Sequence, residues 1–378
     1  MNRRIILALG VAMLAPVGLA HADDTVTIGV LAELSGPGAP SGTNWRDGTR
    51  IAVEEINADG GILGKKVKAN EYDTQTDPQV SRALAQKAID EGAYAIWGTV
   101  YSGSTIVNML VAQQNSVPQF TGSEAPAIVE KGNPFIFRTS SGAQKGVPSL
   151  VPYFKDTLKA KKVAIAWVNN EFGKGGHDVF ASQMKDAGIE VVADVPSEQG
   201  QTDYAADVSK LKESGADAVF VYMNQEESAR FLIEARKQSL PMPLVGEVTL
   251  TEAKVIDLAG AAANGAIAHV GITSTATDNP GIAAFDEKFK NTFHRNPTHD
   301  ALKAYVGAWT TKYVTEMVGK FDGQAFADKM HGLCLKAKDY PHIVLDTCWD
   351  DHGEMSRPSF MVQVKDGKAV VIGTVPAN

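Results

Sequence analysis

Short apolar segments alternate with longer amphipathic segments along most of this chain, and that alternation restricts the fold more than any other feature. Regular alternation of this kind predicts parallel sheets covered by helices. The pattern runs once through the first 121 residues and restarts after residues 135–141. Because 378 residues exceed the usual domain of roughly 100–200 residues, we expect two α/β lobes. In the first unit, strands are expected at 25–32, 66–72, 94–98 and 118–121, and helices at 45–58 and 77–90.

The second unit is expected to be of similar size and to end near residue 271. Two helices, Pro280–Phe293 and His299–Val318, are expected to follow it. A terminal hairpin is predicted at Ser359–Gly373, because Asp366-Gly367 favours a tight turn. Within this unit we expect helices at 147–158, 175–187, 204–214, 227–238 and 252–258, and strands at 163–168, 190–195, 218–222, 243–246 and 265–271.

The stretch Ala95–Val111 carries the clearest indication of a binding site. It is predicted to be a buried strand ending at Trp97-Gly98, a loop rich in hydroxyl groups, and then an amphipathic helix. Ser102 and Ser104 are both suitable helix N-caps, and Gly103 allows close approach of a ligand. The first turn of such a helix offers unpaired N–H groups, so the loop suits a carboxylate. The alternative is an ordinary capped helix that contacts no ligand.

The first 22 residues have the features of a secretory signal peptide. Arg3 and Arg4 precede an apolar run from Ile5 to Ala20, and Ala20-His21-Ala22 is an A-x-A cleavage signal. The apolar run is short for a membrane span, and no later segment is long and apolar enough to cross a membrane. We therefore expect an exported, periplasmic protein without a lipid anchor.

Charge and cysteine content restrict the partners and the compartment further. Loss of Arg3 and Arg4 with the signal peptide changes the formal charge from −8 to −10, which disfavours nucleic acid and anionic membrane as partners. The two cysteines, Cys334 and Cys348, both lie in the exported part, so we expect a disulfide between them. A loop of about 15 residues closed in this way contributes about 3 kcal/mol by the chain-entropy estimate.

Motifs of enzymes are weak or absent, so no cofactor is expected. The spacing Gly36-x-Gly38-x-x-x-Gly42 departs from the G-x-G-x-x-G dinucleotide motif, which leaves an exported nicotinamide-dependent oxidoreductase as a remote alternative. A serine hydrolase would require G-x-S-x-G around Ser102 or Ser123, and neither serine lies in that motif. The histidines are scattered, so no metal site is expected, and Asp350–Glu354 is interpreted as a solvated turn.

Landmarks over the whole mature length match a known family. They are LSGPGAPSGTNWRDGTRIAVEEINADGGILGKKV at 34–67, EYDTQTDP at 71–78, GTVYSGST at 98–105, FRTSS at 137–141, NNEFGKGG at 169–176 and W-D-x-x-G at 349–353. The chain resembles the periplasmic solute-binding proteins of branched-chain amino acid (Leu/Ile/Val) ABC importers. The resemblance implies a two-lobed type I periplasmic binding protein fold, with three crossings between the lobes near 137–141, 271–276 and 349–358. The implied division is 23–138 with 274–350 for the first lobe and 139–273 with 351–378 for the second.

The resemblance also implies a ligand site in the cleft between the lobes. Ser102 lies where the family holds the ligand carboxylate, and Glu247 lies near the acid that holds the ammonium. Phe172 matches an aromatic lid position. Several positions depart from the family. Ser41 replaces an aromatic wall, which is then missing or supplied by Trp45, and Glu226 stands where an aromatic is common. Glu124 stands where a small hydroxyl residue is usual, and Thr76 and Tyr101 replace the family's disulfide. The candidate ligand-binding residues are Ser41, Tyr101, Ser102, Ser123, Glu124, Phe172, Glu226 and Glu247.

These residues predict a binding protein rather than an enzyme. We expect a monomer that captures a small amino acid and delivers it to the membrane permease of an ABC importer. Two extra carboxylates, Glu124 and Glu226, either point to solvent or face a ligand with additional donors, because unpaired buried charges are costly. A simple amino acid therefore ranks first, an amide- or amine-bearing compound second, and an aromatic carboxylate third. A sensory domain with the same fold is a further alternative, which a fused membrane or signalling segment would favour.

Overall fold

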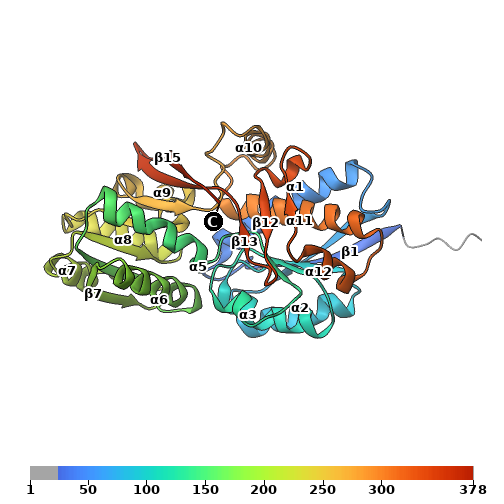
Figure 1. The fold of residues 1–378 in the computed structure, drawn as a ribbon, viewed down its shortest axis with the longest axis horizontal. Coiled ribbons are helices and arrows are strands. Elements are labelled where there is room, and N and C mark those ends of the chain that lie inside the picture. Colours follow the sequence, from blue (N-terminus) through green and yellow to red (C-terminus); the bar gives the residue numbers. More distant parts are fainter. Residues whose placement is uncertain (1–23, 378) are drawn as a thin grey trace, which may run out of the picture.

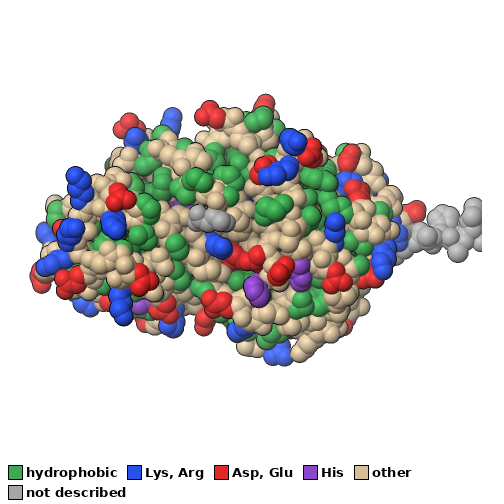
Figure 2. Space-filling view, viewed as in Figure 1, with side chains coloured by type: hydrophobic (Ala, Val, Ile, Leu, Met, Phe, Trp, Pro, Cys, Tyr) green, Lys and Arg blue, Asp and Glu red, His purple; other side chains and the backbone are tan. Residues whose placement is uncertain are grey.

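The computed structural model describes residues 24–377, and within them the chain forms two α/β lobes that lie end to end (Figure 1). The predicted signal peptide lies outside the described residues. No helix among those described is long and apolar enough to cross a membrane. On the face drawn in Figure 2, acidic and basic side chains are interspersed.

The first lobe is built on a five-stranded sheet with the order β2-β1-β3-β4-β5, in which every pairing is parallel. Alternate residues of β1 face opposite layers, as a strand requires. Val30 packs into the cluster that holds α1, α10, α11 and α12, whereas Leu31 packs against α2 and α3. The strands are β1 (Thr25–Ala32), β2 (Lys66–Asp73), β3 (Ala95–Trp97), β4 (Gln119–Thr121) and β5 (Ile136–Arg138). The helices are α1 (Ala39–Ala58), α2 (Pro78–Asp90), α3 (Ser102–Gln114), α4 (Ala127–Glu130), α10 (Pro280–Phe293), α11 (His299–Val318) and α12 (Gly323–Met330).

The second lobe is built on a seven-stranded sheet with the order β15-β14-β10-β9-β8-β6-β7. Strands β6 to β10 pair in parallel, and the C-terminal hairpin β14–β15 adds two antiparallel strands. Helix α6 packs on one face, and α7, α8 and α9 pack on the other. The strands are β6 (Lys162–Val168), β7 (Glu190–Ser197), β8 (Ala218–Tyr222), β9 (Leu244–Glu247), β10 (Ile267–Val270), β14 (Ser359–Lys365) and β15 (Lys368–Val375). The helices are α5 (Ala143–Gly146), α6 (Glu171–Asp186), α7 (Ala205–Glu213), α8 (Gln225–Lys237) and α9 (Ala253–Ala259), and shorter 3₁₀ or π turns lie at Val147–Leu150, Tyr153–Thr157, Val248–Thr251 and Gly260–Ala263. A further 3₁₀ turn, Pro341–Ile343, packs in the core of the first lobe.

A small antiparallel sheet, β11 (Cys334–Leu335), β12 (Thr347–Trp349) and β13 (Met355–Ser356), lies beside the first lobe. Cys334 pairs with Cys348 across β11 and β12, and the two form the predicted disulfide, which is confirmed. Because β13 pairs with β12, this sheet extends beyond the boundary proposed at residue 350.

The chain passes between the two large sheets three times, after β5, after β10 and before β14. Buried arginines hold these passages together. Arg357 donates to the carbonyl oxygens of Gly271 and Thr139, and so joins all three. Arg138 pairs with Glu354 at 2.8 Å, and both side chains are buried. The interpretation of Asp350–Glu354 as a solvated turn is therefore wrong for Glu354, whose carboxylate is needed beside a buried guanidinium.

Most predicted elements are present within a few residues of their expected bounds. The helix predicted at 147–158 is instead a 3₁₀ turn at Val147–Leu150 followed by a π turn at Tyr153–Thr157, and two further local predictions are wrong. Helix α1 begins at Ala39, although Pro40 and Gly42 suggested a loop as far as Gly42. Proline is tolerated in a first helical turn. Gly42 is required there because a Cβ would lie 2.1 Å from the carbonyl oxygen of Glu33. Ser102 and Ser104 are not N-caps of α3, since the capping residue is Tyr101 and no side chain caps the helix.

Candidate ligand-binding cleft

A cavity of ≈ 300 Å³ lies between the two lobes, where the carboxyl ends of their strands face each other. This is the usual position of ligand sites in open α/β sheets. The first lobe contributes the loops after β3 and β4 together with the start of α11, and the second contributes the loops after β6, β8 and β9. The lining residues are Ser41, Thr76, Pro78, Val100–Ser104, Gly122, Glu124, Asn170–Phe172, Gln199, Asn224, Gln225, Glu247, Thr249, His299, Asp300 and Lys303.

The loop after β3 is held rigidly by hydroxyl groups behind it. Gly98 has φ +121°, and a Cβ there would lie 1.8 Å from the carbonyl oxygen of Leu31, so only glycine fits. Thr105 Oγ1 lies 2.8 Å from Thr99 Oγ1 and 2.6 Å from Ser123 Oγ, which donates to the carbonyl oxygen of Val100 at 2.7 Å. These bonds fix the backbone that leads into α3.

A buried carboxylate supports the same loop from the other side. Glu33, at the end of β1, accepts hydrogen bonds from the backbone N–H of Tyr101 at 3.0 Å and of Val100 at 3.4 Å. Burial raises the pKa of Glu33 to about 7, against these two hydrogen bonds. Glu33 therefore positions Tyr101 and the start of α3 without lining the cavity.

Ser102 lies at the first position of α3 and lines the cavity. Its hydroxyl oxygen accepts a hydrogen bond from the N–H of Ala125 at 3.2 Å, and its own proton remains available to another acceptor. The first-turn N–H groups of this 13-residue helix lie beside it. The position can therefore hold a carboxylate, although the hydroxyl does not cap the helix as predicted.

Glu124 is buried and lines the cavity, and its charge is matched by a lysine from α11. Lys303 Nζ lies 2.9 Å from Glu124 Oε1, and Ser140 donates to the same oxygen. Burial opposes ionisation, but Lys303 outweighs it and holds the pKa of Glu124 below its usual range. Glu124 is thus an ionised, paired group in the lining of the cavity.

Glu247 lies on the second lobe, at the end of β9, and lines the same cavity. Burial and the nearby charge of Glu124 raise its pKa well above the usual range. Its carboxyl group accepts from Thr249, through the N–H at 3.3 Å and the hydroxyl at 3.1 Å. A cationic group placed in the cavity would reverse this shift and ionise Glu247.

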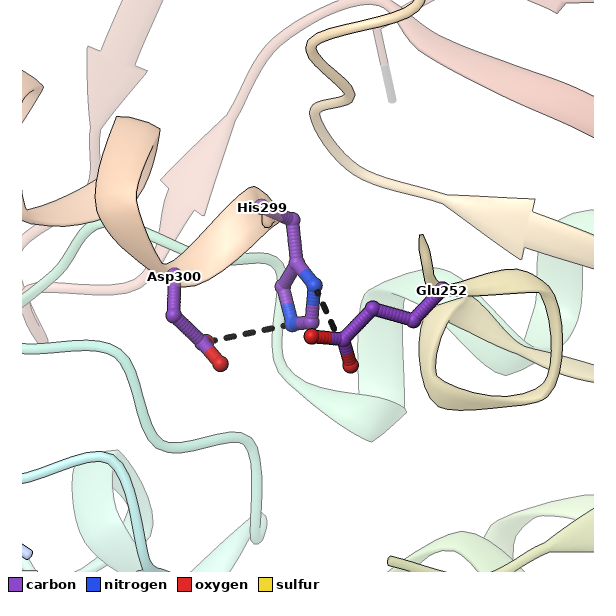
Figure 3. Close-up of side chains that lie close together, drawn as sticks. All are labelled: Glu252, His299 and Asp300. Atoms are coloured by element: carbon purple, nitrogen blue, oxygen red, sulfur yellow. Dashed lines mark ion pairs between the residues drawn. The ribbon is translucent and has the colours of Figure 1, made fainter. Parts of the chain in front are cut away.

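A second charged cluster, which comprises Glu252, His299 and Asp300, joins the lobes (Figure 3). His299 and Asp300 begin α11, whereas Glu252 precedes α9 in the other lobe. His299 Nε2 lies 3.1 Å from Asp300 Oδ1, and Nδ1 lies 3.8 Å from Glu252 Oε2. Potential metal-ligating atoms of the three lie within 4.8 Å of one another. However, the carboxylates face different ring nitrogens, whereas metal ligands converge on one point, so the cluster suits a bridging imidazole better than a metal ion.

Direct hydrogen bonds also cross the cleft. Gln225, at the start of α8, donates to Ser41 Oγ at 2.6 Å and to Glu252 Oε2 at 3.0 Å. Ser41 belongs to α1 of the first lobe, so the Ser41–Gln225 bond is formed by protein atoms of both lobes.

The cleft brings together six of the eight candidate residues from the sequence. Ser41, Tyr101, Ser102, Glu124, Phe172 and Glu247 line the cavity. Phe172 stacks against Tyr222, with ring centroids 4.4 Å apart. Trp45 does not supply the missing aromatic wall, because it is fully buried in the core of the first lobe.

The other two candidates lie outside the lining. Ser123 is buried behind the loop after β3, where it bonds Thr105 and Val100. Glu226 is on the outer side of α8, 43% exposed, in an ion pair with Arg230 at 2.9 Å. Of the two unexplained carboxylates, Glu124 thus faces the cavity and Glu226 faces solvent.

Sequence reasoning missed the polar residues of α8 and α11 that line the cavity. They are Asn224, Gln225, His299, Asp300 and Lys303. One signal was present in the sequence: α11 is buried along nearly its whole length, yet it carries Asp300 and Lys303 one turn apart. Charges in a helix buried all round require partners, and so mark a site.

Comparisons with known proteins agree with this architecture. A family model described as periplasmic binding protein matches residues 25–369. A leucine-, isoleucine-, valine-, threonine- and alanine-binding protein of Pseudomonas aeruginosa is 26% identical over 360 residues, covering 95% of this chain and 94% of the relative. The Leu/Ile/Val-binding protein of Escherichia coli is 26% identical over 363 residues, covering 94% and 95%.

Solved structures show the same fold. A branched-chain amino acid transporter binding protein from Streptococcus pneumoniae, in complex with isoleucine, superposes with a TM-score of 0.83 at 23% identity, covering 94% of this chain and 99% of that one. A solute-binding protein from Rhodopseudomonas palustris, in complex with benzoate, gives 0.84 at 20% identity, covering 94% and 97%.

Proposed function

The chain belongs to the periplasmic binding protein family, and on that premise we propose that it captures a small amino acid-like ligand in its cleft and delivers it to an ABC importer. It is a periplasmic protein, and its partners are the small-molecule ligand and the membrane permease. The amino acid-binding relatives match it over almost their whole length, which supports this assignment.

The observation that carries the proposal is a cavity that offers both hydrogen-bond donors and a carboxyl group. The start of α3, with Ser102, offers N–H and O–H donors to a carboxylate. Glu247, which has no lysine partner among the described residues, offers an acceptor to an ammonium group. An α-amino acid carries both groups on adjacent atoms, so it matches this pair of subsites.

We further propose that the site binds its ligand without catalysing a reaction. Within the described chain, His299 pairs with two carboxylates rather than with a serine or a cysteine. Ser102 is bonded to a backbone N–H instead of a general base. Neither arrangement activates a nucleophile.

A thermal-shift screen over amino acids, amines, amides and aromatic acids tests the proposal. A ligand present at 100 times its Kd adds about 2.7 kcal/mol to the free energy of unfolding, which is readily measured. We expect amino acids or their amides to shift the midpoint, and small-angle scattering to show compaction with the same ligand. A shift with aromatic monocarboxylates alone, or with no compound in the screen, would overturn the proposed ligand class.

A further inference from the structure

Three side chains that line the cavity carry buried polar atoms without a hydrogen-bond partner among the described residues. They are Asn224 Nδ2, His299 Nδ1 and both carboxylate oxygens of Asp300. Asp300 is fully buried, and Asn224 and His299 are each 6% exposed. Buried polar groups in proteins are nearly always satisfied, so unpaired atoms on residues that line a cavity indicate what its occupant supplies.

The unpaired atoms require two kinds of hydrogen-bond partner, a donor and an acceptor. The oxygens of Asp300 require N–H or O–H donors, and the amide nitrogen of Asn224 requires an acceptor. An aliphatic side chain offers neither, and it would exclude the water that could otherwise bond these groups. A ligand side chain with both a donor and an acceptor satisfies them together.

The charges around Asp300 favour a neutral donor over a cation. Lys303 Nζ lies 3.6 Å from Asp300 Oδ1, and His299 Nε2 lies 3.1 Å from it. A ligand ammonium or guanidinium at this point would lie beside Lys303 and be repelled. A ligand carboxylate would face Asp300 and Glu124, which are both ionised because Lys303 and His299 outweigh the effect of burial on their pKa values.

Apolar surface forms the larger part of the cavity lining and suits a hydrocarbon stem. The lining contains Pro78, Val100, Tyr101 and Phe172 as its larger apolar groups, against a majority of polar residues.

We propose that the ligand is an α-amino acid whose side chain ends in a planar, uncharged group with both N–H donors and a carbonyl oxygen, namely a carboxamide or a ureido group. Asn224 and Asp300 determine this specificity. The inference rests on the proposed function, because it assigns the side-chain end of the same amino acid site.

Calorimetry with isosteric ligand pairs tests the inference on the unaltered protein. The first pair is L-asparagine and L-leucine, whose side chains have the same shape but differ in polarity. The second pair is L-glutamine and L-glutamate, whose side chains have the same shape but differ in charge. We expect the amide of each pair to bind at least tenfold more tightly, with L-citrulline as the ureido probe and L-lysine and L-arginine as cationic probes. Tighter binding of leucine, glutamate, lysine or arginine would overturn the side-chain assignment and leave the proposed function standing.

Two variants test whether Asn224 determines the preference for amide side chains. Asn224→Leu keeps the side-chain shape and removes the donor, and Asn224 makes no side-chain cap bond that would be lost. We expect it to reduce the asparagine-to-leucine preference at least tenfold, whereas Glu226→Gln, on the solvent side of the same helix, leaves the preference unchanged. Thermal unfolding of both variants verifies that they fold. An unchanged preference in folded Asn224→Leu would contradict the assignment, and failure of all amino acids to bind the wild type would overturn the proposed function as well.

Discussion

Two buried ion-pair networks lie close together in this molecule, and they differ in how many hydrogen bonds hold their charged groups. At the passage between the lobes, Arg138 donates to the carbonyl oxygens of Ser123 and Ala125, and Glu354 accepts from Gly142 and Gln144. In the cleft, the Asp300 carboxylate lies in ion pairs with His299 and Lys303, and its oxygens accept no well-aligned hydrogen bond within the described residues.

This difference distinguishes a network that stabilises the fold from one that takes part in ligand binding. A buried charge held by several hydrogen bonds contributes to one fixed arrangement, whereas one that accepts few can be completed by a ligand. The passage network is therefore expected to govern stability, and the cleft network is expected to govern binding. Substitutions in each network can separate the two.

The largest effect is expected from Arg138→Met, which leaves Glu354 buried and unpaired. Breaking a buried pair in this way costs about 3–5 kcal/mol of stability. The midpoint of chemical denaturation measures the loss, with Arg50→Ala as the control. Arg50 is 51% exposed in its pair with Glu71, and such pairs contribute about 0.2–1 kcal/mol. Equal effects of the two variants would remove the distinction between the passage network and a surface pair.

Lys303→Met is expected to reverse the pH dependence of stability. In the wild type the pKa values of Glu124 and Asp300 are lowered, although burial opposes this, so their contribution is present above the ordinary carboxyl pKa and is lost as pH falls. Without the lysine, burial dominates and raises both pKa values. Stability should then fall, by about 1–3 kcal/mol, as pH rises from about 5 to 8. Denaturation midpoints across this range provide the measurement, and a variant that keeps the wild-type slope would show that the lysine does not hold these charges.

Ser102→Ala should act on binding and not on stability. Loss of one charge-assisted hydrogen bond weakens binding by about 1.5–3 kcal/mol, roughly ten- to a hundredfold. Calorimetry with the ligand found in the screen gives the change in Kd, and Glu226→Gln is the matched control outside the cavity. If Ser102→Ala bound the ligand with wild-type affinity, the assignment of the ligand carboxylate to the start of α3 would be contradicted.

Glu247 gives the smallest predicted effect. Burial and Glu124 raise its pKa well above the usual range, so an ammonium-bearing ligand binds with release of a proton from this group. Affinity should therefore increase with pH, by up to about tenfold per unit, while Glu247 is protonated in the free protein. Glu247→Gln should abolish this dependence. A flat profile in the wild type would contradict the assignment of the ammonium to Glu247.

Much of the fold could be predicted because periodicity is a local property. The helices Pro280–Phe293 and His299–Val318 begin and end where the apolar pattern predicts. The start of α1 was mispredicted, because Pro40 and Gly42 favour a loop by composition. Only the contact of Gly42 with the backbone of Glu33 explains why a helix needs glycine there.

The candidate site likewise contains residues that the local sequence predicts and residues that it does not. Ser102, Glu124 and Glu247 follow strands, so the ends of those strands predict their position. Lys303 could not be placed, because it is 179 residues from Glu124 in sequence and meets it only in the folded chain. Glu226 was misleading because one residue of helical register decides which side of α8 faces the cleft.

The Ser41–Gln225 hydrogen bond, which crosses the cleft between protein atoms, has a consequence for timing. It has to break whenever the lobes separate, whatever the cleft contains. Its contribution is therefore the same for every ligand: it lengthens the dwell time of each in equal proportion and leaves the ratio between competing ligands unchanged. A chain without this bond would release its cargo sooner at the permease and would select among solutes no less sharply.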